Sequence, residues 1–256
     1  MPAGTVDRPA DSCNLVRNFT VCVLLYGDFP KLAARCLGKI AALAKLGAIE
    51  LRIGCNAISA RSESVLREFG VARHVVCSAP KNLKKYPMMR RLFAGGSDAP
   101  SDGYTVSTPY VMWFDDDSYI SSEDPLDWLA SVERQMARAD LIGSVYHIWL
   151  NENQRRWIHT QPWYAGQPFP MNDLVPYPTG GWWAVRTSLL RQYDWPLRAL
   201  VHRGGDVMLG ELVRQQGLRL AHFRQGVAIN ANVYGEESQS RRRGFDSDPI
   251  GWDYQG

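Results

Sequence analysis

The chain has 256 residues with 45% hydrophobic content, which is enough for a full core in one large domain or two small ones. Its formal net charge of +3 is weak evidence for any polyanionic partner. No stretch approaches the roughly 20 apolar residues of a membrane span, and residues 1–13 carry charge and proline where a signal peptide needs an apolar block. We therefore expect a cytoplasmic protein, bacterial or viral in a host cytoplasm, with no membrane partner.

The cysteines all lie in the first third of the chain and form no CxxC or zinc-like spacing. Most of them sit among apolar residues of predicted strands and helices. We expect reduced thiols, as is usual in the cytosol. The cysteines are Cys13, Cys22, Cys36, Cys55 and Cys77.

The first eighty residues alternate between β-forming and amphipathic segments. Runs rich in β-forming residues predict strands at 19–27, 49–56 and 72–78. Apolar spacing between these runs predicts helices at 31–47 and 62–70, the second capped by Ser62. This β-α-β-α-β order implies a mostly parallel sheet covered by helices.

The remainder of the chain continues the alternation with fewer clear signals. A helix is expected after Pro87, and another is expected to start with Asp124 as N-cap and Pro125 in the first turn. Apolar runs predict strands at 110–114, 141–150, 180–186 and 218–223, and helical spacing predicts helices at 188–193 and 206–217. Residues 151–179 are rich in aromatics and proline with little periodicity, and the tail from residue 235 on is expected to be mobile.

Three consecutive aspartates, Asp115, Asp116 and Asp117, stand where the predicted strand 110–114 would end. Carboxylates this close repel one another and shift toward the neutral form unless a cation offsets their charge. Oxygen ligands suit Mg²⁺ or Mn²⁺. At strand spacing Asp115 and Asp117 point to one side and Asp116 to the other, so the triplet can supply a metal ligand and a second acid. The plainer alternative is a solvated strand end followed by a helix cap.

This acidic strand resembles the DxD signature of GT-A-type glycosyltransferases, in the variant of the fringe-like enzymes. Downstream, GGWWAVRTSLL at 180–190 resembles the Gly-Gly-aromatic segment that lines their acceptor site and that of family 2 glycosyltransferases. GGDVMLGELVRQQGLRL at 204–220 resembles their Glu-Asp-Val block. Three motifs in the expected order, within about residues 18–224, are more specific than one. Gly205 departs from the pattern, which leaves Asp206 as the one acid at that position.

The resemblance implies one GT-A domain, a Rossmann-like α/β fold with a mostly parallel central sheet flanked by helices. Residues 18–117 would bind the nucleotide sugar and 118–234 the acceptor, with a flexible tail at 235–256. The implied activity is inverting transfer of a sugar from a nucleotide-diphosphate sugar, UDP favoured, to a hydroxyl acceptor with Mn²⁺ or Mg²⁺. In this scheme Asp117, with Asp115, holds the metal, and Asp116 contacts ribose or sugar hydroxyls.

Two residues late in the chain complete the implied chemistry. Asp206 is expected to be the general base that takes the acceptor's proton, and the alternative is a helix N-cap. His222, near the end of the last predicted strand, is expected to be a third metal ligand, with an ordinary edge residue as the alternative.

The donor is expected at the carboxyl ends of the first strands, where open α/β sheets bind nucleotides. That position favours Tyr26, Asp28 and Asn56 for the nucleotide. Lys85 and Arg90 lie where related enzymes contact the nucleotide, so they are candidates for base or phosphate contact. The alternative for both is a solvated basic helix face.

The acceptor side is expected around Gly181, Trp182 and Trp183. Because neighbouring residues alternate sides of a strand, one tryptophan should be buried and the other should face the acceptor. Aromatic faces stack on sugars and on bases alike, so the acceptor stays open among glycan, protein, small molecule and nucleic acid. A hydroxymethylated base in phage-type DNA is one candidate, with Arg241–Arg243 on phosphates.

Two other functions remain as alternatives. FDDDSYI at 114–120 loosely resembles the nucleophile loop of haloacid-dehalogenase-like phosphatases, although the motif lies late in the chain and no clear acidic pair follows. A non-catalytic binding protein that keeps the GT-A fold is the other alternative. The intact triplet and Asp206 argue against it.

Overall fold

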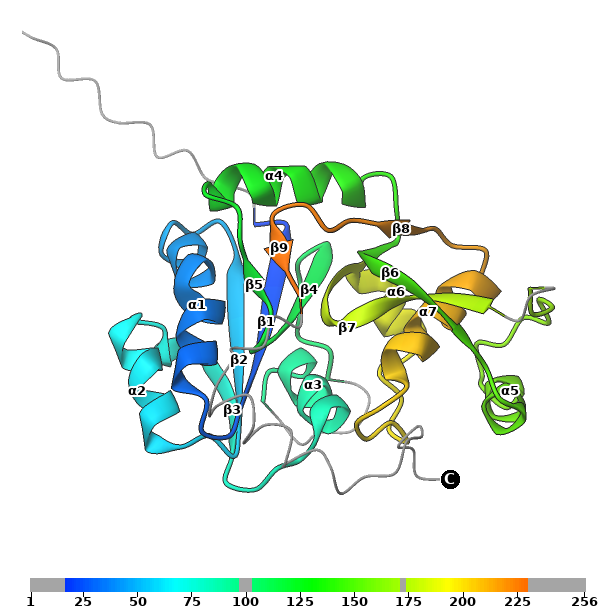
Figure 1. Cartoon of the computed structure of the whole chain (residues 1–256), viewed down its shortest axis with the longest axis horizontal. Coiled ribbons are helices and arrows are strands. Elements are labelled where there is room, and N and C mark those ends of the chain that lie inside the picture. Colours follow the sequence, from blue (N-terminus) through cyan, green and yellow to red (C-terminus); the bar gives the residue numbers. More distant parts are fainter. Residues whose placement is uncertain (1–16, 97–102, 171–173, 230–256) are drawn as a thin grey trace, which may run out of the picture.

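A seven-stranded sheet in the order β3-β2-β1-β4-β7-β6-β8 runs through the computed structural model, which describes residues 17–96, 103–170 and 174–229 (Figure 1). Its strands are β1 (Phe19–Tyr26), β2 (Glu50–Asn56), β3 (Val75–Ala79), β4 (Tyr110–Asp115), β6 (Leu141–Trp149), β7 (Leu174–Arg186) and β8 (Leu220–His222). A second, two-stranded sheet pairs β5 (Tyr119–Ile120) with β9 (Val227–Ala228).

The sheet is mostly parallel, as predicted. Strand β1 pairs in parallel with β2 and β4, β2 pairs with β3, and β6 pairs with β8. Only β7 runs against its neighbours β4 and β6. The chain builds β2 and β3 on one side of β1 and then returns to place β4 on the other. This reversal falls at the carboxyl ends of β1 and β4, and open α/β sheets bind ligands in the crevice outside such a reversal of strand order.

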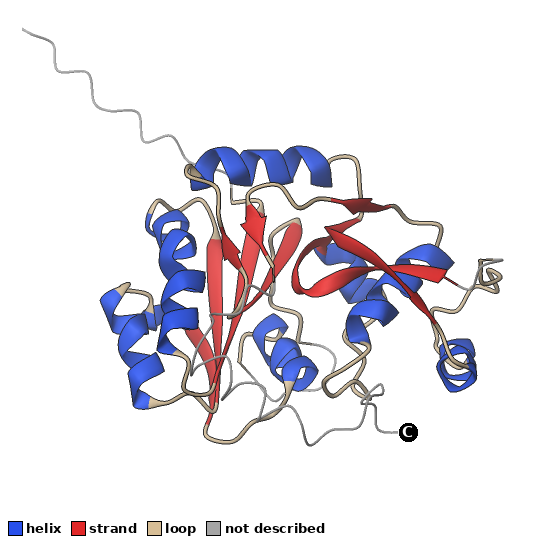
Figure 2. Cartoon of the chain, in the orientation of Figure 1, coloured by secondary structure: helices blue, strands red, loops and turns tan. Residues whose placement is uncertain are grey.

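Helices cover both faces of the sheet (Figure 2). The helices are α1 (Pro30–Lys45), α2 (Ala60–Glu68), α3 (Lys85–Phe93), α4 (Pro125–Met136), α5 (Glu152–His159), α6 (Thr187–Gln192) and α7 (Gly205–Gln215), with a 3₁₀ turn at Ala72–His74. One hydrophobic core joins α1, α2 and α4 to the sheet, and a second joins α3, α6 and α7 to the opposite face. The chain therefore forms a single α/β domain, as predicted.

Local signals placed some helix ends correctly and others wrongly. Asp124 caps α4 and Pro125 lies in its first turn, as predicted. Helix α2 starts earlier than predicted, because Ser59 is the N-cap and accepts a hydrogen bond from the backbone N–H of Ser62 at 3.2 Å. Helix α3 begins before Pro87, which the first turn of a helix tolerates.

Residues 151–179, whose sequence has little periodicity, contain a helix and part of a strand. Helix α5 lies there behind a capping box formed by Asn151 and Gln154, and β7 extends back to Leu174. Its prolines made this strand difficult to predict from the sequence. Pro176 and Pro178 lie in the part of β7 that pairs with β6 but not with β4, so one edge of the strand lacks a ladder there and tolerates residues without an N–H.

Two further expectations can be compared with the structure. Cys22, Cys36, Cys55 and Cys77 are free and buried, as predicted, whereas Cys13 lies outside the described residues. In the described part of the chain no helix is long and apolar enough to cross a bilayer. The predicted mobile tail also lies outside the described residues.

We expect opposite effects from alanine at two helical glycines. A Cβ at Gly210 of α7 would lie 2.7 Å from the Cα of Tyr177 in β7, so Gly210→Ala should destabilise the fold by about 1–3 kcal/mol through overpacking. A Cβ at Gly38 of α1 would meet nothing within 4 Å, so Gly38→Ala should stabilise by about 0.5–1 kcal/mol. Urea unfolding of both variants measures the difference. Equal effects would contradict the close approach of α7 to β7.

Candidate active site

The three aspartates lie at the crevice but are not solvated. Asp115 is the last residue of β4, and the other two follow in a turn closed by the Ser118 N–H, which donates to the Asp115 carbonyl at 2.9 Å. Asp116 is 3% exposed and Asp117 is 7% exposed. The alternative of a solvated strand end is therefore wrong. Because the strand ends at Asp115, the predicted alternation of sides does not extend to Asp117.

The positive charge against this acidic strand end is Lys85. Its Nζ donates to Asp115 Oδ2 at 3.1 Å and to the Gly180 carbonyl at 2.6 Å, and it lies 3.5 Å from Asp206 Oδ2. The lysine is 7% exposed. One buried ammonium thus joins the end of β4 and the middle of β7 to the start of α7. It brings together two of the acids that the sequence singled out.

Aromatic side chains pack against this ion cluster. Trp113 Nε1 donates to Asp115 Oδ1 at 2.8 Å, so each oxygen of that carboxylate accepts a hydrogen bond from a protein donor. The Trp113 and Trp183 rings stack with centroids 6.1 Å apart, and the Lys85 Nζ lies 5.8 Å from the centroids of both Trp113 and Tyr86. Electrostatic interactions in such an apolar setting are stronger than in water.

Charge and burial act in opposite directions on the titrating groups. Burial lowers the pKa of Lys85, but the carboxylates of Asp115 and Asp206 raise it more, so its pKa lies above the ordinary value. Burial raises the pKa of Asp206 more than Lys85 lowers it, and Asp115 adds to the rise. Tyr86 and Trp183 lower the pKa of Asp206, although Tyr86 Oη and Trp183 Nε1 have no fully formed hydrogen bond among the described residues.

The loop before α3 sets the position of Lys85. The Asn56 side chain accepts from the Leu83 N–H at 2.8 Å and donates to Asn82 Oδ1 at 2.9 Å. Asn82 Oδ1 accepts from the Lys84 N–H as well, and Lys84 has the unusual positive φ of 70°. Asn56 was predicted to contact the donor, but its amide holds this loop.

Glycines let Asp206 reach the lysine. The N-cap of α7 is Gly204, with φ 84°, and Asp206 lies in the first turn, so the alternative of Asp206 as an N-cap is wrong. A Cβ at Gly180 would lie 2.8 Å from Lys85 Nζ and would also collide with the Asp206 carboxylate. A Cβ at Gly205, where the resemblance calls for an acid, would lie 2.6 Å from Tyr86 Oη. A larger residue at either position would displace the cluster.

The predicted donor residues Tyr26 and Asp28 lie at the end of β1. The Tyr26 N–H donates to Asp116 Oδ2 at 3.3 Å, which links the first strand to the triplet. Asp28 accepts from Ser59 and forms an exposed ion pair with Arg61 at 3.3 Å. Both residues border the crevice where nucleotide binding was predicted.

The structure does not support the predicted role of Arg90. Its guanidinium donates to the side chain of Asp194 at 3.2 Å and to the carbonyls of Asp194 and Pro196. Arg90 thus ties α3 to the loop after α6.

The predicted acceptor residues are buried. Trp182 and Trp183 do lie on opposite sides of β7, but both are 0% exposed, since both faces of the sheet are covered. The expectation that one of them faces the acceptor is therefore wrong. The Trp183 side chain instead lies next to the Asp206 carboxylate. Gly181 is buried as well.

His222 does not join the aspartates. It ends β8, where its Nδ1 accepts from the Val145 N–H at 3.1 Å. Strands β7 and β6 separate β8 from β4, which puts His222 about 14 Å away at the usual strand spacing. Among the described residues no group of three His, Cys, Asp or Glu side chains could hold a metal. The prediction of His222 as third ligand is wrong.

The remaining carboxylates nevertheless fit a divalent cation that also binds the substrate. Lys85 interacts with three carboxylates, those of Asp115, Asp206 and Asp117, so several acids share this one ammonium. Mg²⁺ and its analogues are commonly held by one or two carboxylates plus substrate phosphates. Both oxygens of Asp115 accept hydrogen bonds, from Trp113 and Lys85. Asp117 is the other ligand that the sequence predicted.

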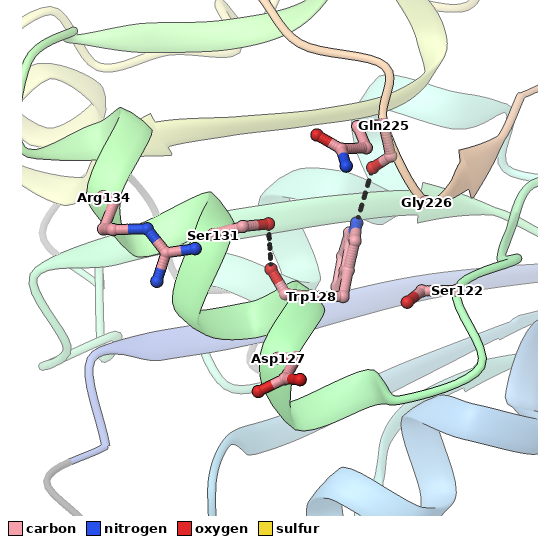
Figure 3. Close-up of a pocket in the computed structure, with 7 residues that line it drawn as sticks. All are labelled: Ser122, Asp127, Trp128, Ser131, Arg134, Gln225 and Gly226. Carbon is pink, nitrogen blue, oxygen red and sulfur yellow. Dashed lines mark hydrogen bonds between the residues drawn. The ribbon is translucent and has the colours of Figure 1, made fainter.

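A pocket of about 390 Å³ lies elsewhere, between α4 and the turn before β9 (Figure 3). Trp128 Nε1 donates to the Gln225 carbonyl at 3.0 Å on one side of it. The pocket adjoins the core of α1, α2 and α4, whereas Lys85 and Trp113 lie on the opposite face. It contains none of the predicted site residues and no group suited to the chemistry of the triplet.

Sequence reasoning missed Tyr86, Trp113 and Gly180 as parts of the site. Each lies one or two residues from a residue that was singled out, but no local signal distinguishes it. Their roles depend on contacts between residues as far apart as Lys85 and Gly180.

No family model and no curated protein matches the sequence. Solved structures match the fold. The mannosyltransferase PcManGT from Pyrobaculum calidifontis, in complex with GDP-Man and Mn²⁺, superposes with a TM-score of 0.54 at 14% identity, over 93% of this chain and 64% of that one. S. aureus TarS superposes with a TM-score of 0.50 at 13% identity, over 81% of this chain and 35% of that one.

The chain has a GT-A fold. This confirms the predicted fold class, a Rossmann-like α/β domain with a mostly parallel sheet flanked by helices. The chain spans 64% and 35% of the lengths of the two matching proteins, at identities that carry the fold and not the activity.

The raised pKa of Asp206 predicts how stability depends on pH. A carboxyl whose pKa is higher in the folded chain adds stability that is fully present below its unfolded pKa of about 3.9. That stability is lost as pH rises through the folded pKa. The unfolding free energy of the wild type minus that of Asp206→Asn should therefore fall as pH rises from about 4. Urea unfolding across this range measures it, and a difference that grows with pH would mean that Lys85 outweighs burial.

Proposed function

We propose that this chain is a glycosyltransferase that uses a nucleotide-diphosphate sugar, with Asp206 as the general base. The observation that carries the proposal is the meeting of Asp206 with the acidic end of β4 around Lys85. It occurs at the crevice of a GT-A fold, where ligands of open α/β sheets bind. A buried constellation of this kind costs folding free energy and is typical of functional sites.

Asp206 suits the removal of a proton from an acceptor hydroxyl. Its side chain is 18% exposed, so it is mostly desolvated but still reachable. Its raised pKa makes it a better proton acceptor than a free carboxylate, and Lys85 favours the ionised form that a base requires. The neighbouring glycines leave room beside it, because a Cβ at Gly180 would occupy the space at the carboxylate.

We assign the binding of the nucleotide-sugar donor to the other acids. Mn²⁺ or Mg²⁺, when bound, would act as a Lewis acid on the departing diphosphate, and we assign Asp117 to hold it together with the diphosphate oxygens. Asp116, anchored by the Tyr26 N–H, is assigned to the ribose or sugar hydroxyls. The presence of GDP-Man and Mn²⁺ together in the PcManGT complex supports the use of a nucleotide sugar with a divalent cation.

The nucleotide is assigned to the border of the crevice near Tyr26 and Asp28. UDP is favoured by the resemblance of the acidic strand, and inverting transfer follows from a base that acts directly on the acceptor. A panel of UDP- and GDP-sugars with Mn²⁺, read by mass spectrometry, tests the donor class. Release of sugar or nucleotide from any member supports the proposal, and no turnover across the panel contradicts it.

The acceptor class is tested by the same assay. Hydroxymethylated DNA, glycans, peptides and small alcohols each present a hydroxyl, and transfer of donor mass to one of them identifies the class. The two alternative functions gain no specific support. The GT-A fold does not favour a phosphatase, and a non-catalytic binding protein would bind a nucleotide sugar without turnover.

Replacing Asp206 with Asn should stop transfer without harming binding. The amide keeps the size of the side chain but cannot take the proton, so turnover should fall by roughly 10²-fold or more. Nucleotide affinity should stay at the wild-type value. The matched control is Asp127→Asn, which changes an exposed acid in the first turn of α4 and should leave turnover unchanged. Wild-type transfer by the Asp206 variant would move the base elsewhere.

Nucleotide binding should depend on the metal. Without a cation, Asp117 would meet the diphosphate as a like charge, so calorimetry with UDP or GDP should show weaker binding in EDTA than in Mn²⁺. Asp117→Asn should remove this difference between the two conditions. Equal affinity of the wild type in EDTA and Mn²⁺ would remove the metal from the proposal.

A further inference from the structure

The Lys85 ammonium group uses two of its donors in hydrogen bonds within the protein, and it forms an ion pair with Asp206. An ammonium carries three donors. Three acceptors surround this one, namely Asp115 Oδ2 at 3.1 Å, the Gly180 carbonyl at 2.6 Å and Asp206 Oδ2 at 3.5 Å. They come from β4, β7 and α7, which converge only in the folded chain. A donor phosphate would compete with these acceptors for the ammonium.

The Asp206 carboxylate has Lys85 as its ion-pair partner, and Tyr86 and Trp183 also lie next to it. It makes no capping hydrogen bond in α7, and its Oδ1 is buried without a hydrogen-bond partner in the described part of the chain. Its one ion pair in the described residues is with Lys85. Without the ammonium, the carboxylates of Asp206 and Asp115 would face each other as like charges. They would then separate or one would take up a proton.

We propose that Lys85 is the positioning residue of the general base, and that Asp115 serves as its anchor and not as a metal ligand. The inference rests on the proposed function of Asp206. It divides the acidic triplet between two tasks. Asp115 acts through Lys85 on the acceptor side, whereas Asp117 serves the diphosphate.

The surroundings of Lys85 fit a positioning role. Asn56 and Asn82 hold the loop that precedes it, and the backbone N–H of Tyr86 donates to the Val201 carbonyl at 3.1 Å, just before α7. The start of α3 is thus tied to the segment that carries Asp206. A lysine meant to follow a mobile substrate would have no need of such fixed supports.

A double-mutant cycle between Lys85→Met and Asp206→Asn tests the inference. Methionine approximates the length of the lysine stem without the charge. At saturating donor, Lys85→Met should lower turnover by about 10²-fold, the cost of a base displaced by about 1 Å. Donor affinity measured by calorimetry should not change. In the Asp206→Asn background, Lys85→Met should cause no further loss, because its effect passes through the carboxylate.

Lys81→Met is the matched control, since it makes the same change at an exposed lysine four residues earlier. It should leave turnover and stability unchanged. If Lys85→Met instead weakens donor binding and leaves turnover at saturating donor intact, Lys85 contacts the donor and the inference is overturned. Losses that add in the double variant also overturn it, because the lysine would then act independently of Asp206.

Unfolding measurements test the pairing without relying on activity. Lys85→Met should lower the urea midpoint more when residue 206 is Asp than when it is Asn. In the first case the substitution leaves the buried Asp206 carboxylate without its cation. The absence of this non-additivity overturns the inference even if the chain is an active enzyme. A wild-type chain that turns over no nucleotide sugar overturns the proposed function, and with it the catalytic meaning of the pair.

Asp115→Asn provides a milder variant if Lys85→Met does not fold. The amide keeps the shape of the anchor but removes its charge, so turnover should fall while the Mn²⁺ affinity of the nucleotide-bound protein stays constant. A drop in Mn²⁺ affinity of tenfold or more, about 1.4 kcal/mol, would make Asp115 a metal ligand and overturn the assigned division.

Discussion

The structure around the crevice depends on one constraint, a buried ammonium that must have acceptors on all sides. Leaving a charge unpaired in the interior costs several kcal/mol, about 3–5 when one partner of a buried pair is removed. Lys85 meets this requirement with two carboxylates and one carbonyl, and aromatic rings close the space around it. The end of β4, the middle of β7 and the start of α7 are therefore held in one relative position.

Small residues make this arrangement sterically feasible. Gly180, Gly205 and Gly210 lie where a Cβ would collide with Lys85, with Tyr86 or with the backbone of β7, respectively. Gly205, at the start of α7, is thus required for close packing against Tyr86. Its chemical consequence is that the carboxylate at the helix start reaches the strand end. A buried network, Glu211, Arg214 and Gln215, then fastens the other end of α7 to residues 165–168.

The fold explains why acids of one short segment can serve different chemistry. The strand geometry ends at Asp115, whose carboxylate lies on the face of Trp113 and Lys85. The turn that follows brings Asp116 to the backbone of β1. Adjacent residues therefore have different neighbours, since Asp115 binds the fixed ammonium of Lys85 and Asp116 accepts from the backbone of β1.

Much of this protein follows from the sequence alone. The alternation of strands and helices, the cap at Asp124 and the acidic strand end come from local patterns, because hydrophobic periodicity and capping act between near neighbours. The sequence also singled out Asp206. Only the tertiary structure showed that Lys85 pairs with it, that Trp182 and Trp183 are both buried, that Arg90 braces a loop and that His222 lies on a distant edge. Those outcomes depend on which strands become neighbours and which faces are covered, and these contacts form between residues far apart in the chain.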